Sequence, residues 1–529
     1  MALSLAQIQT PHLDWLGLSP HIVMAGAAIV LLTVVSLAGP RLPAWFAAAW
    51  TIATGLAVIG LAFALWMRFD DGPFGPAGQG LSTAANAIGV GRFAVFLIVL
   101  LAAVVVLTVL VADGFLRREN LDVPAVYVLL MLSAAGGMTM VSANNLIVLF
   151  LGLEILSLAV YVLVAMHLRR SAGQEAGIKY FVLGAFASAF FLYGIALIYG
   201  ATGSLNLAEI SVRNGWSGFV GVVNTGSLGV TSSLEELELA SAPAVVVDKG
   251  LLYVGMAMLL VGFGFKVAAV PFHAWTPDVY QGAPSPVVVY MAAGVKAAGF
   301  GALARVFMLG FAGAIDDWRP AIFALAVASL AVGSLLAIVQ SDIKRILAYS
   351  SISHAGFILV GVHGGYADGV ASVMFYLANY AAMAIGSFAV VTVMSGPGDE
   401  NTDISSLRGL ASRRPVLAGA FTLLLLSQAG IPFTAGFWAK FEVISAVANN
   451  SSVSLAVLAM LAAVVAAFLY LRIVVTMYLE PPDADAPKVN IALGPATAIA
   501  TVVLFTLAFG IYPEPLREMS QQAITLLAP

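Results

Sequence analysis

Long apolar stretches separated by short polar ones occupy almost the whole chain. A helix needs about 20 mostly apolar residues to cross the hydrocarbon core of a bilayer. About fourteen segments satisfy this condition: residues 20–38, 43–66, 91–112, 124–141, 145–166, 176–200, 250–270, 284–310, 318–340, 344–362, 367–395, 415–448, 453–478 and 491–513. The pattern therefore predicts an all-α polytopic membrane protein.

Two of the predicted spans contain helix breakers. The seventh runs into Pro271, and the twelfth is interrupted by Gly430-Ile431-Pro432. Proline removes a backbone donor, so a break of this kind persists in a membrane only where protein or water satisfies the freed groups. A lysine lies near each break, in GFGFKVAAVPFHAW (262–275) and in QAGIPFTAGFWAK (428–440).

The two broken spans lie five apart in span order, which indicates an internal duplication. We predict two five-helix repeats, and because five is odd the second has inverted topology, as in many secondary transporters. The predicted domains are an N-terminal three-helix flank (1–123), a first repeat (124–310) with an external loop (201–249), a second repeat (311–478) and a C-terminal helix (479–529). The loop sequence SSLEELELASAPAVVVDKG is compatible with a short surface helix or with a solvated loop.

Composition and charge agree with a membrane protein and narrow its chemistry. The chain is 61% hydrophobic and 9% charged, whereas soluble proteins carry roughly a quarter charged residues. A net charge of −4 argues against a nucleic-acid partner. The chain has no Cys, which excludes disulfides and Cys-ligated iron–sulfur clusters. A P-loop pattern is also missing from the sequence, so ATP does not drive this chain directly.

The distribution of Lys and Arg in the loops predicts the orientation, because basic loops face the cytoplasm. The larger set is Arg41, Arg117, Arg118, Arg169, Arg170, Lys179, Lys344, Arg345, Arg408, Arg413, Arg414 and Lys488. The smaller set, on the other side, is Arg68, Arg92, Arg213, Lys249, Arg319 and Arg517. Both termini and the 201–249 loop are therefore predicted to lie outside.

A few charged residues fall within the predicted spans. Lys296 is central in its span, and Lys266 and Lys440 flank the two helix breaks. Arg305 and Arg472 lie nearer span ends, so we expect them to extend toward the membrane interface. Among acids, Glu154 is central in its span, and Glu442 follows Lys440 by two residues on a different helix face.

Two interpretations of these charges remain open. Ionisable groups at membrane depth mark ion or proton pathways by default, but they also form ion pairs that hold helices together. Burial disfavours the charged form of a lysine and a nearby carboxylate favours it. Movement of Glu154 toward or away from Lys266 would therefore control whether the lysine holds its proton. His354 and His273 are further candidates for proton relay, with hydrogen-bonded packing as the alternative.

Several motifs resemble the antiporter-like membrane subunits of respiratory complex I and of Mrp antiporters. The run FGFKVAAVPFHAWTPDVYQGAPSPVVVYMAAGVKAAGF (263–300) is similar to the hallmark of this family. The segment IKYFVLGAFASAFFLYGIALIYGATGS (178–204) more specifically resembles subunit N of the proton-translocating NADH:quinone oxidoreductase, and IPFTAGFWAKFEVI (431–444) agrees. The 206–249 loop is longer than we expect for the family.

The resemblance implies a function and a set of site residues. It implies proton translocation through Glu154, Lys266, Lys296, Lys440 and, less directly, His354. It places no cofactor in this chain; NADH, FMN, iron–sulfur clusters and quinone would be bound elsewhere in the complex. The implied partners are other antiporter-like and small membrane subunits, with the peripheral redox arm reached through them, in a bacterial plasma membrane. The alternatives are an Mrp-type cation/proton antiporter subunit and a structural scaffold.

Overall fold

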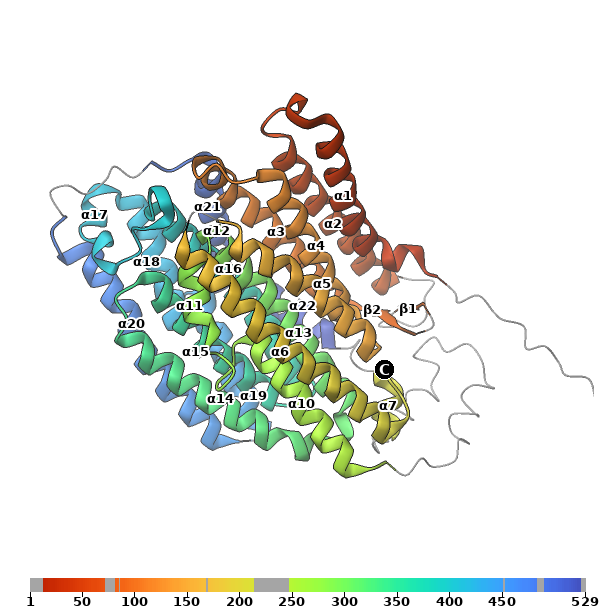
Figure 1. The fold of residues 1–529 in the computed structure, drawn as a ribbon. Helices are drawn as coiled ribbons and strands as arrows, with labels where there is room; N and C mark the ends of the chain where they lie inside the picture. Colours follow the sequence, from red (N-terminus) through yellow and green to blue (C-terminus); the bar gives the residue numbers. More distant parts are fainter. Residues whose placement is uncertain are drawn as a thin grey trace, which may run out of the picture.

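The computed structural model describes residues 13–71, 81–84, 86–167, 170–213, 247–450, 452–482 and 490–524. The acidic stretch SSLEELELASAPAVVVDKG lies almost entirely outside the described residues, as do the ends of the chain. The described part is a bundle of long helices, with the first helices at one side and α20 at the opposite side (Figure 1).

The N-terminal flank has three long helices and a small hairpin. Its elements are α1 (Trp15–Ala38), α2 (Phe46–Asp71), β1 (Leu81–Thr83), β2 (Ile88–Val90) and α3 (Arg92–Arg118). Asp14 begins α1 by accepting hydrogen bonds from the backbone N–H groups of Leu16 and Gly17, the usual role of an N-cap carboxylate. The antiparallel β1–β2 pair was not predicted, because strands of three residues carry too little alternation to be recognised.

The next group of helices includes the first broken span. It consists of α4 (Val123–Ser142), α5 (Leu146–Ala165), α6 (Ser171–Thr202), α7 (Leu207–Arg213), α10 (Lys249–Val267), α11 (Trp275–Gly282), α12 (Ser285–Tyr290), a π-helical turn (Met291–Val295) and α13 (Lys296–Arg305), followed by a second π-helical turn (Val306–Gly310). The break between α10 and α11 is closed by protein groups. The N–H of Val270 donates to Ser329 Oγ at 2.9 Å, and Trp275 Nε1 donates to the Phe265 carbonyl at 3.0 Å.

The remaining helices include the second break. They are α14 (Ile315–Ile338), α15 (Ile343–His363), α16 (Asp368–Met394), α17 (Leu410–Arg413), α18 (Pro415–Ala429), α19 (Ala435–Asn450), α20 (Val453–Leu479), α21 (Leu493–Ile511) and α22 (Glu514–Ile524), with short 3-10 turns between some of them. At the α18–α19 break Gly430 has a φ of 88°, a backbone conformation that residues other than glycine rarely adopt. The N–H of Gly436 donates to Ser427 Oγ at 3.0 Å across this break.

The number of spans agrees with the sequence. In the described residues, 13 helices are long and apolar enough to cross a membrane, and Pro415–Ala429 is a shorter apolar helix. Together with α19 this shorter helix forms the broken twelfth span. The predicted fold class, with about fourteen spans and breaks in the seventh and twelfth, is confirmed.

The spans differ strongly in how far they are buried, and the most buried ones form the core of the bundle. In the apolar 18-residue stretch of each span, all residues of Ser285–Gly310 and 94% of those of α15 and α16 are buried, against 17% of those of α1 and 33% of those of α20. Helices that are apolar on all sides and well covered by protein form the interior of such a bundle. The most protected helices are therefore α12, α13, α15 and α16, and these include the helices that carry Lys296 and His354.

A buried ion pair within the second predicted repeat is also contacted by residues of the first. Lys344 Nζ of α15 lies 3.0 Å from Asp399 Oδ2 in the segment after α16, and neither side chain is exposed to solvent. Ser285, at the start of α12, donates to Asp399 Oδ1 at 2.6 Å, and Arg170 lies 3.4 Å from Oδ2. Lys344, expected at the cytoplasmic end of its span, is thus an internal residue that ties α15 to α6 and α12.

Replacement of Asp399 by asparagine is expected to destabilise the protein. Removal of one partner leaves the Lys344 charge buried and uncompensated, which costs about 3–5 kcal/mol. Thermal unfolding of the detergent-solubilised chain measures the loss. Asp278→Asn is the control, because that carboxylate is 37% exposed and bridges Lys179 and Arg345; a smaller loss is expected there. Unchanged stability of Asp399→Asn would contradict a stabilising ion pair.

The stability of the protein is also expected to depend on pH through Asp399. Burial raises the pKa of the Asp399 carboxyl, but the Lys344 ammonium and the Ser285 hydroxyl lower it by a larger amount, so the pKa lies below its ordinary value. The stabilisation is therefore complete above the unfolded-state pKa of about 3.9 and is lost as the pH falls through the folded-state pKa. Asp399→Asn is expected to lack this part of the acid sensitivity when stability is measured from pH 6 to pH 3.

Candidate functional site

Lys266 lies at the end of α10, immediately before the first helix break. Its side chain is 4% exposed, and Nζ donates a hydrogen bond of 2.7 Å to Ser157 Oγ of α5. The Ser157 hydroxyl donates in turn to the Leu153 carbonyl at 2.5 Å. The ammonium group is therefore held by a hydroxyl on the neighbouring helix.

Glu154 lies on α5, three residues before Ser157. Within the described part of the chain its Oε1 is buried and has no hydrogen-bond partner, and no ion pair joins it to Lys266. The two groups are nevertheless close enough for electrostatic attraction. Glu154 and Lys266 therefore lie near each other, Ser157 contacts the lysine in this conformation, and a Glu154–Lys266 couple in proton transfer stays a prediction.

A small cavity lies beside this couple. Its volume is about 10 Å³, and Ser157, Tyr161, Ser188 and Lys266 supply the polar part of its lining. A cavity of about this size with several polar partners is at the lower limit for one water molecule. A proton on Lys266 therefore has a hydroxyl neighbour and space for a water-mediated contact.

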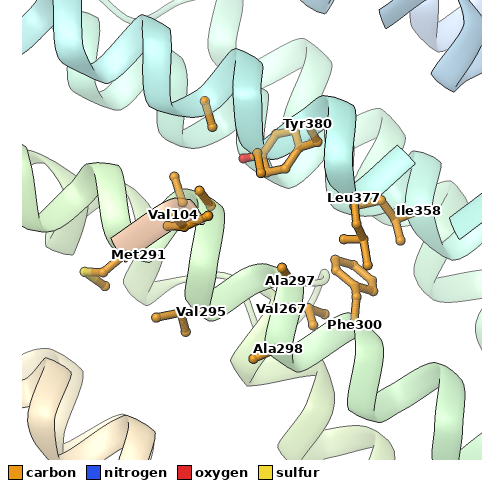
Figure 2. Packing of buried hydrophobic residues seen from close by; sticks show 14 of the residues in the cluster. Val104, Val267, Met291, Val295, Ala297, Ala298, Phe300, Ile358, Leu377 and Tyr380 are labelled. Atoms are coloured by element: carbon orange, nitrogen blue, oxygen red, sulfur yellow. The ribbon is translucent and has the colours of Figure 1, made fainter. Parts of the chain in front are cut away.

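Lys296 lies at the centre of the bundle, directly after the π-helical turn Met291–Val295. Its Nζ donates to the Ser351 carbonyl at 2.6 Å and also to the Ser351 hydroxyl. The ammonium lies 5.5 Å from the centre of the Tyr380 ring, a cation–π distance. Figure 2 shows the apolar packing around this position, with Val295 and Ala297 on the same segment and Tyr380 on the facing helix.

His354 lies on α15, between two tyrosines. Its Nδ1 is 2.7 Å from the Tyr376 hydroxyl, and its Nε2 is 3.2 Å from the Tyr470 hydroxyl. Tyr470 is also 2.6 Å from Ser350 Oγ. Both ring nitrogens therefore have exchangeable partners, which is what a relay between neutral and protonated imidazole requires.

Lys440 occupies the position on α19 that follows the second break. Its Nζ donates to the Ala429 carbonyl of α18 at 2.9 Å and lies 4.7 Å from the centre of the Phe357 ring. The carbonyl is available because the helix ends there at Gly430. The break thus supplies the oxygen that stabilises the lysine.

Helix α15 connects the central lysine to the last one. Ser351 contacts Lys296, His354 follows three residues later, and Phe357, three residues further, contacts Lys440. This spacing places all three on neighbouring positions of one helix face. His354 is also within electrostatic range of both lysines. The structure therefore brings Lys296, His354 and Lys440 together along α15, and it places Glu154 and Lys266 near each other on α5 and α10.

Sequence reasoning missed some groups. The partners Ser157, Tyr376 and Tyr470 carry no charge and resemble ordinary packing residues in the sequence. Arg305 is 4% exposed and donates to the Ala143 carbonyl at 2.9 Å and to Asn144 Oδ1 at 2.5 Å. Both acceptors belong to the short connection between α4 and α5, so the guanidinium reaches the end of the neighbouring spans and is covered there by protein.

The other polar and charged candidates form contacts of their own, outside the set of Glu154, Lys266, Lys296, His354 and Lys440. Arg472 is half-buried and donates to the Ile338 and Gln340 carbonyls at the end of α14. Glu442, on a different helix face from Lys440, forms an ion pair of 3.2 Å with Arg517 of α22. His273 is half-buried in the first break and contacts neither Lys266 nor Lys296 within hydrogen-bond distance. In the described residues, no cluster of three or more His, Asp or Glu suits a metal ion.

Comparison with known proteins places the chain in a family. The model of the family described as NADH:quinone oxidoreductase/Mrp antiporter, TM matches residues 143–466. A curated relative from Salinispora arenicola, an NADH-quinone oxidoreductase subunit N, is 37% identical over 98% of this chain and 99% of its own. The chain belongs to the NADH:quinone oxidoreductase/Mrp antiporter family. Another subunit N, from Parafrankia sp., is 43% identical over 77% of this chain and 73% of its own.

Solved structures agree with this family. A chain of respiratory complex I from Thermus thermophilus has a TM-score of 0.75 at 31% identity and covers 94% of this chain and 98% of its own. A chain of the Mrp complex from Dietzia sp. has a TM-score of 0.78 at 20% identity, with 97% of each chain covered. The second likeness shows a shared fold. The predicted resemblance to complex I subunits is confirmed.

Replacement of Lys296 or Lys440 by methionine is expected to leave the protein stable. Within the described residues, neither ammonium contacts a carboxylate, so each replacement removes a buried charge and leaves no opposite charge unpaired, only the neutral oxygens of Ser351 or Ala429. The free energy of unfolding should equal that of the wild type or exceed it by about 1–4 kcal/mol. Lys344→Met is the matched control, because it removes the closest cation from the buried Asp399 carboxylate, leaves only Arg170 at 3.4 Å, and should be destabilised. A large loss in Lys296→Met or Lys440→Met would instead support a purely structural role.

Proposed function

We propose that this chain is the subunit N-type, proton-translocating membrane subunit of an NADH:quinone oxidoreductase, and that Glu154, Lys266, Lys296, His354 and Lys440 carry the protons. The observation that carries the proposal is the line of buried cations held by uncharged oxygens. Each of the three lysines donates to a hydroxyl or a carbonyl. Such groups stabilise an ammonium without fixing it as firmly as a carboxylate does.

The proposed first step takes place between Glu154 and Lys266. A carboxylate that approaches the ammonium stabilises the protonated lysine, and its withdrawal favours release of the proton. Lys266 in this conformation donates to Ser157 and, within the described residues, forms no ion pair with Glu154, so a closer approach of Glu154 would add to the stabilisation of the charged lysine. A neighbouring subunit that attracts or repels Glu154 would therefore control the proton on Lys266.

The proposed path then runs through Lys296 and along α15 to Lys440. Ser351 and His354 lie between the two lysines, and the tyrosines beside His354 provide hydroxyl groups for transfer through short contacts or water. The chain has no Cys ligands for iron–sulfur clusters. We infer that NADH, FMN, the clusters and quinone are bound by other subunits, including a peripheral arm reached through neighbouring membrane subunits.

We also propose a membrane location and an internal symmetry for this chain. We infer a bacterial plasma membrane, with the Arg- and Lys-rich side facing the cytoplasm and both termini outside. We also propose that residues 124–310 and 311–478 are inverted repeats, because each contains a break that lies next to a buried lysine. An Mrp-type antiporter remains the second candidate by fold, but the identities of the curated relatives favour the oxidoreductase.

The first test identifies the proteins and the activity that copurify with the chain. The tagged chain, extracted gently from its own membrane, is expected to bring NADH-dependent quinone reduction and flavin and iron–sulfur proteins with it. A chain that purifies without redox proteins and exchanges cations for protons in liposomes would contradict the oxidoreductase proposal and favour the antiporter.

Lys266→Ala tests the proton path within the assembled complex. Proton uptake into proteoliposomes, driven by NADH oxidation, is expected to fall about tenfold or more, as for loss of a general acid–base group. Lys249→Ala is the matched control, since Lys249 begins the same helix and is exposed. Full proton uptake in a stably assembled Lys266→Ala complex would exclude Lys266 from the path.

A further inference from the structure

Two large grooves lie on the lateral surface of the helix bundle, and they differ in charge. The groove between α5 and α6 has a volume of about 670 Å³ and is lined by apolar residues with Tyr161 and Gln174. The groove between α18 and α21 has a volume of about 540 Å³, and Arg413 and Arg414 line it together with apolar residues. The second groove therefore combines an apolar wall with two guanidinium groups.

The two arginines lie at one end of this groove, directly before Pro415, the first residue of α18. Arg413 is oriented by the protein, because its Nη2 donates to the Ser406 and Arg408 carbonyls at 3.2 and 3.1 Å. The Arg414 side chain is exposed, and within the described residues it forms no ion pair and does not cap α18. Its guanidinium is thus available to an anion at the mouth of the groove.

The rest of the groove extends along the first turns of α21. Its lining runs from Ala496 to Leu504, which is about 12 Å at 1.5 Å per residue. Val416 is 86% exposed and Leu504 is 66% exposed. An occupant therefore needs an anionic group at one end and a hydrocarbon segment of at least this length.

We propose that the α18–α21 groove binds an anionic glycerophospholipid, with the phosphate at Arg413 and Arg414 and one acyl chain along α21. Charge complementarity and the apolar continuation together specify this occupant. A free phosphate would leave the apolar wall uncovered, and a zwitterionic lipid would bring no net negative charge to the arginines. The arginines lie on the membrane side that carries most of the basic loops, where anionic headgroups are attracted.

Lipid titration of the purified full chain tests the proposal. The delipidated chain in detergent is titrated with phosphatidylglycerol or phosphatidylcholine, and bound lipid is counted by native mass spectrometry. Phosphatidylglycerol is expected to bind about tenfold more tightly. The Arg413→Gln/Arg414→Gln double variant should lose this preference, and Ala500→Phe should weaken binding by filling the apolar wall.

Two matched controls separate the groove from general effects. Arg41→Gln removes an exposed arginine from the same predicted membrane side, and Ala508→Phe adds the same bulk at an exposed position further along α21. Both should bind phosphatidylglycerol as the wild type does. Equal affinity for the two lipids, or unchanged binding in the double arginine variant, would overturn the proposal. Displacement of the lipid by millimolar inorganic phosphate, with no effect of Ala500→Phe, would also overturn it.

A second measurement uses the lack of cysteine in this chain. Ala500→Cys introduces its only thiol, which can be cross-linked in native membranes. A photoreactive phosphatidylglycerol analogue is expected to label this chain near residue 500. A thiol-directed cross-link to another protein chain instead would assign the groove to a subunit contact and contradict lipid occupancy.

Discussion

The cost of placing an ammonium group away from water is the constraint on which the interior of this protein depends. Lys266, Lys296 and Lys440 are each almost completely buried, and a buried charge requires hydrogen bonds or a partner in place of water. The protein provides a serine hydroxyl, a serine carbonyl and the free carbonyl of a helix end. Neutral oxygens of this kind allow the lysine to exist with or without its proton, whereas a carboxylate contact would favour the charged form.

The helix breaks follow from the same constraint. Inside an uninterrupted helix each carbonyl already accepts a backbone hydrogen bond, as the Ser351 carbonyl does besides its bond from Lys296, whereas the carbonyls at a helix end have no such partner. The break after Ala429 frees a carbonyl for Lys440, and side chains and backbone groups of neighbouring helices satisfy what remains. Helix α15 then joins the two halves, since it contacts Lys296 and Lys440 on one face and reaches Asp399 through Lys344 at its beginning. Stability and the proposed proton path are thus concentrated in one well-buried helix.

Much of the fold could be predicted from the sequence, because lipid exposure requires long apolar helices and every break stands out against them. The same reasoning identified Lys296, Lys266, Lys440 and Glu154, since a charge in an apolar run is conspicuous. It could not identify Ser157, Tyr376 or Tyr470, which matter only through three-dimensional contacts. Asp399 was missed because it lies in a polar segment, where a carboxylate is ordinary, and only folding buries it against Lys344.

Arg305 shows a related limit of the sequence pattern. Position within a span predicts depth, but it does not predict whether protein oxygens surround the side chain. Here the Ala143 carbonyl and Asn144, in the connection between α4 and α5, accept its hydrogen bonds. Sequence patterns therefore locate charged residues along a membrane helix more readily than they assign their partners.

We propose that the buried lysines form one connected, hydrated path and are not isolated structural groups. Water-resolving electron cryomicroscopy of the chain in its native complex can show whether this path exists. Ordered water is expected to link Lys296, His354 and Lys440, with successive donor–acceptor distances of about 2.7–3.2 Å. Dry apolar packing between these three side chains would exclude such a path.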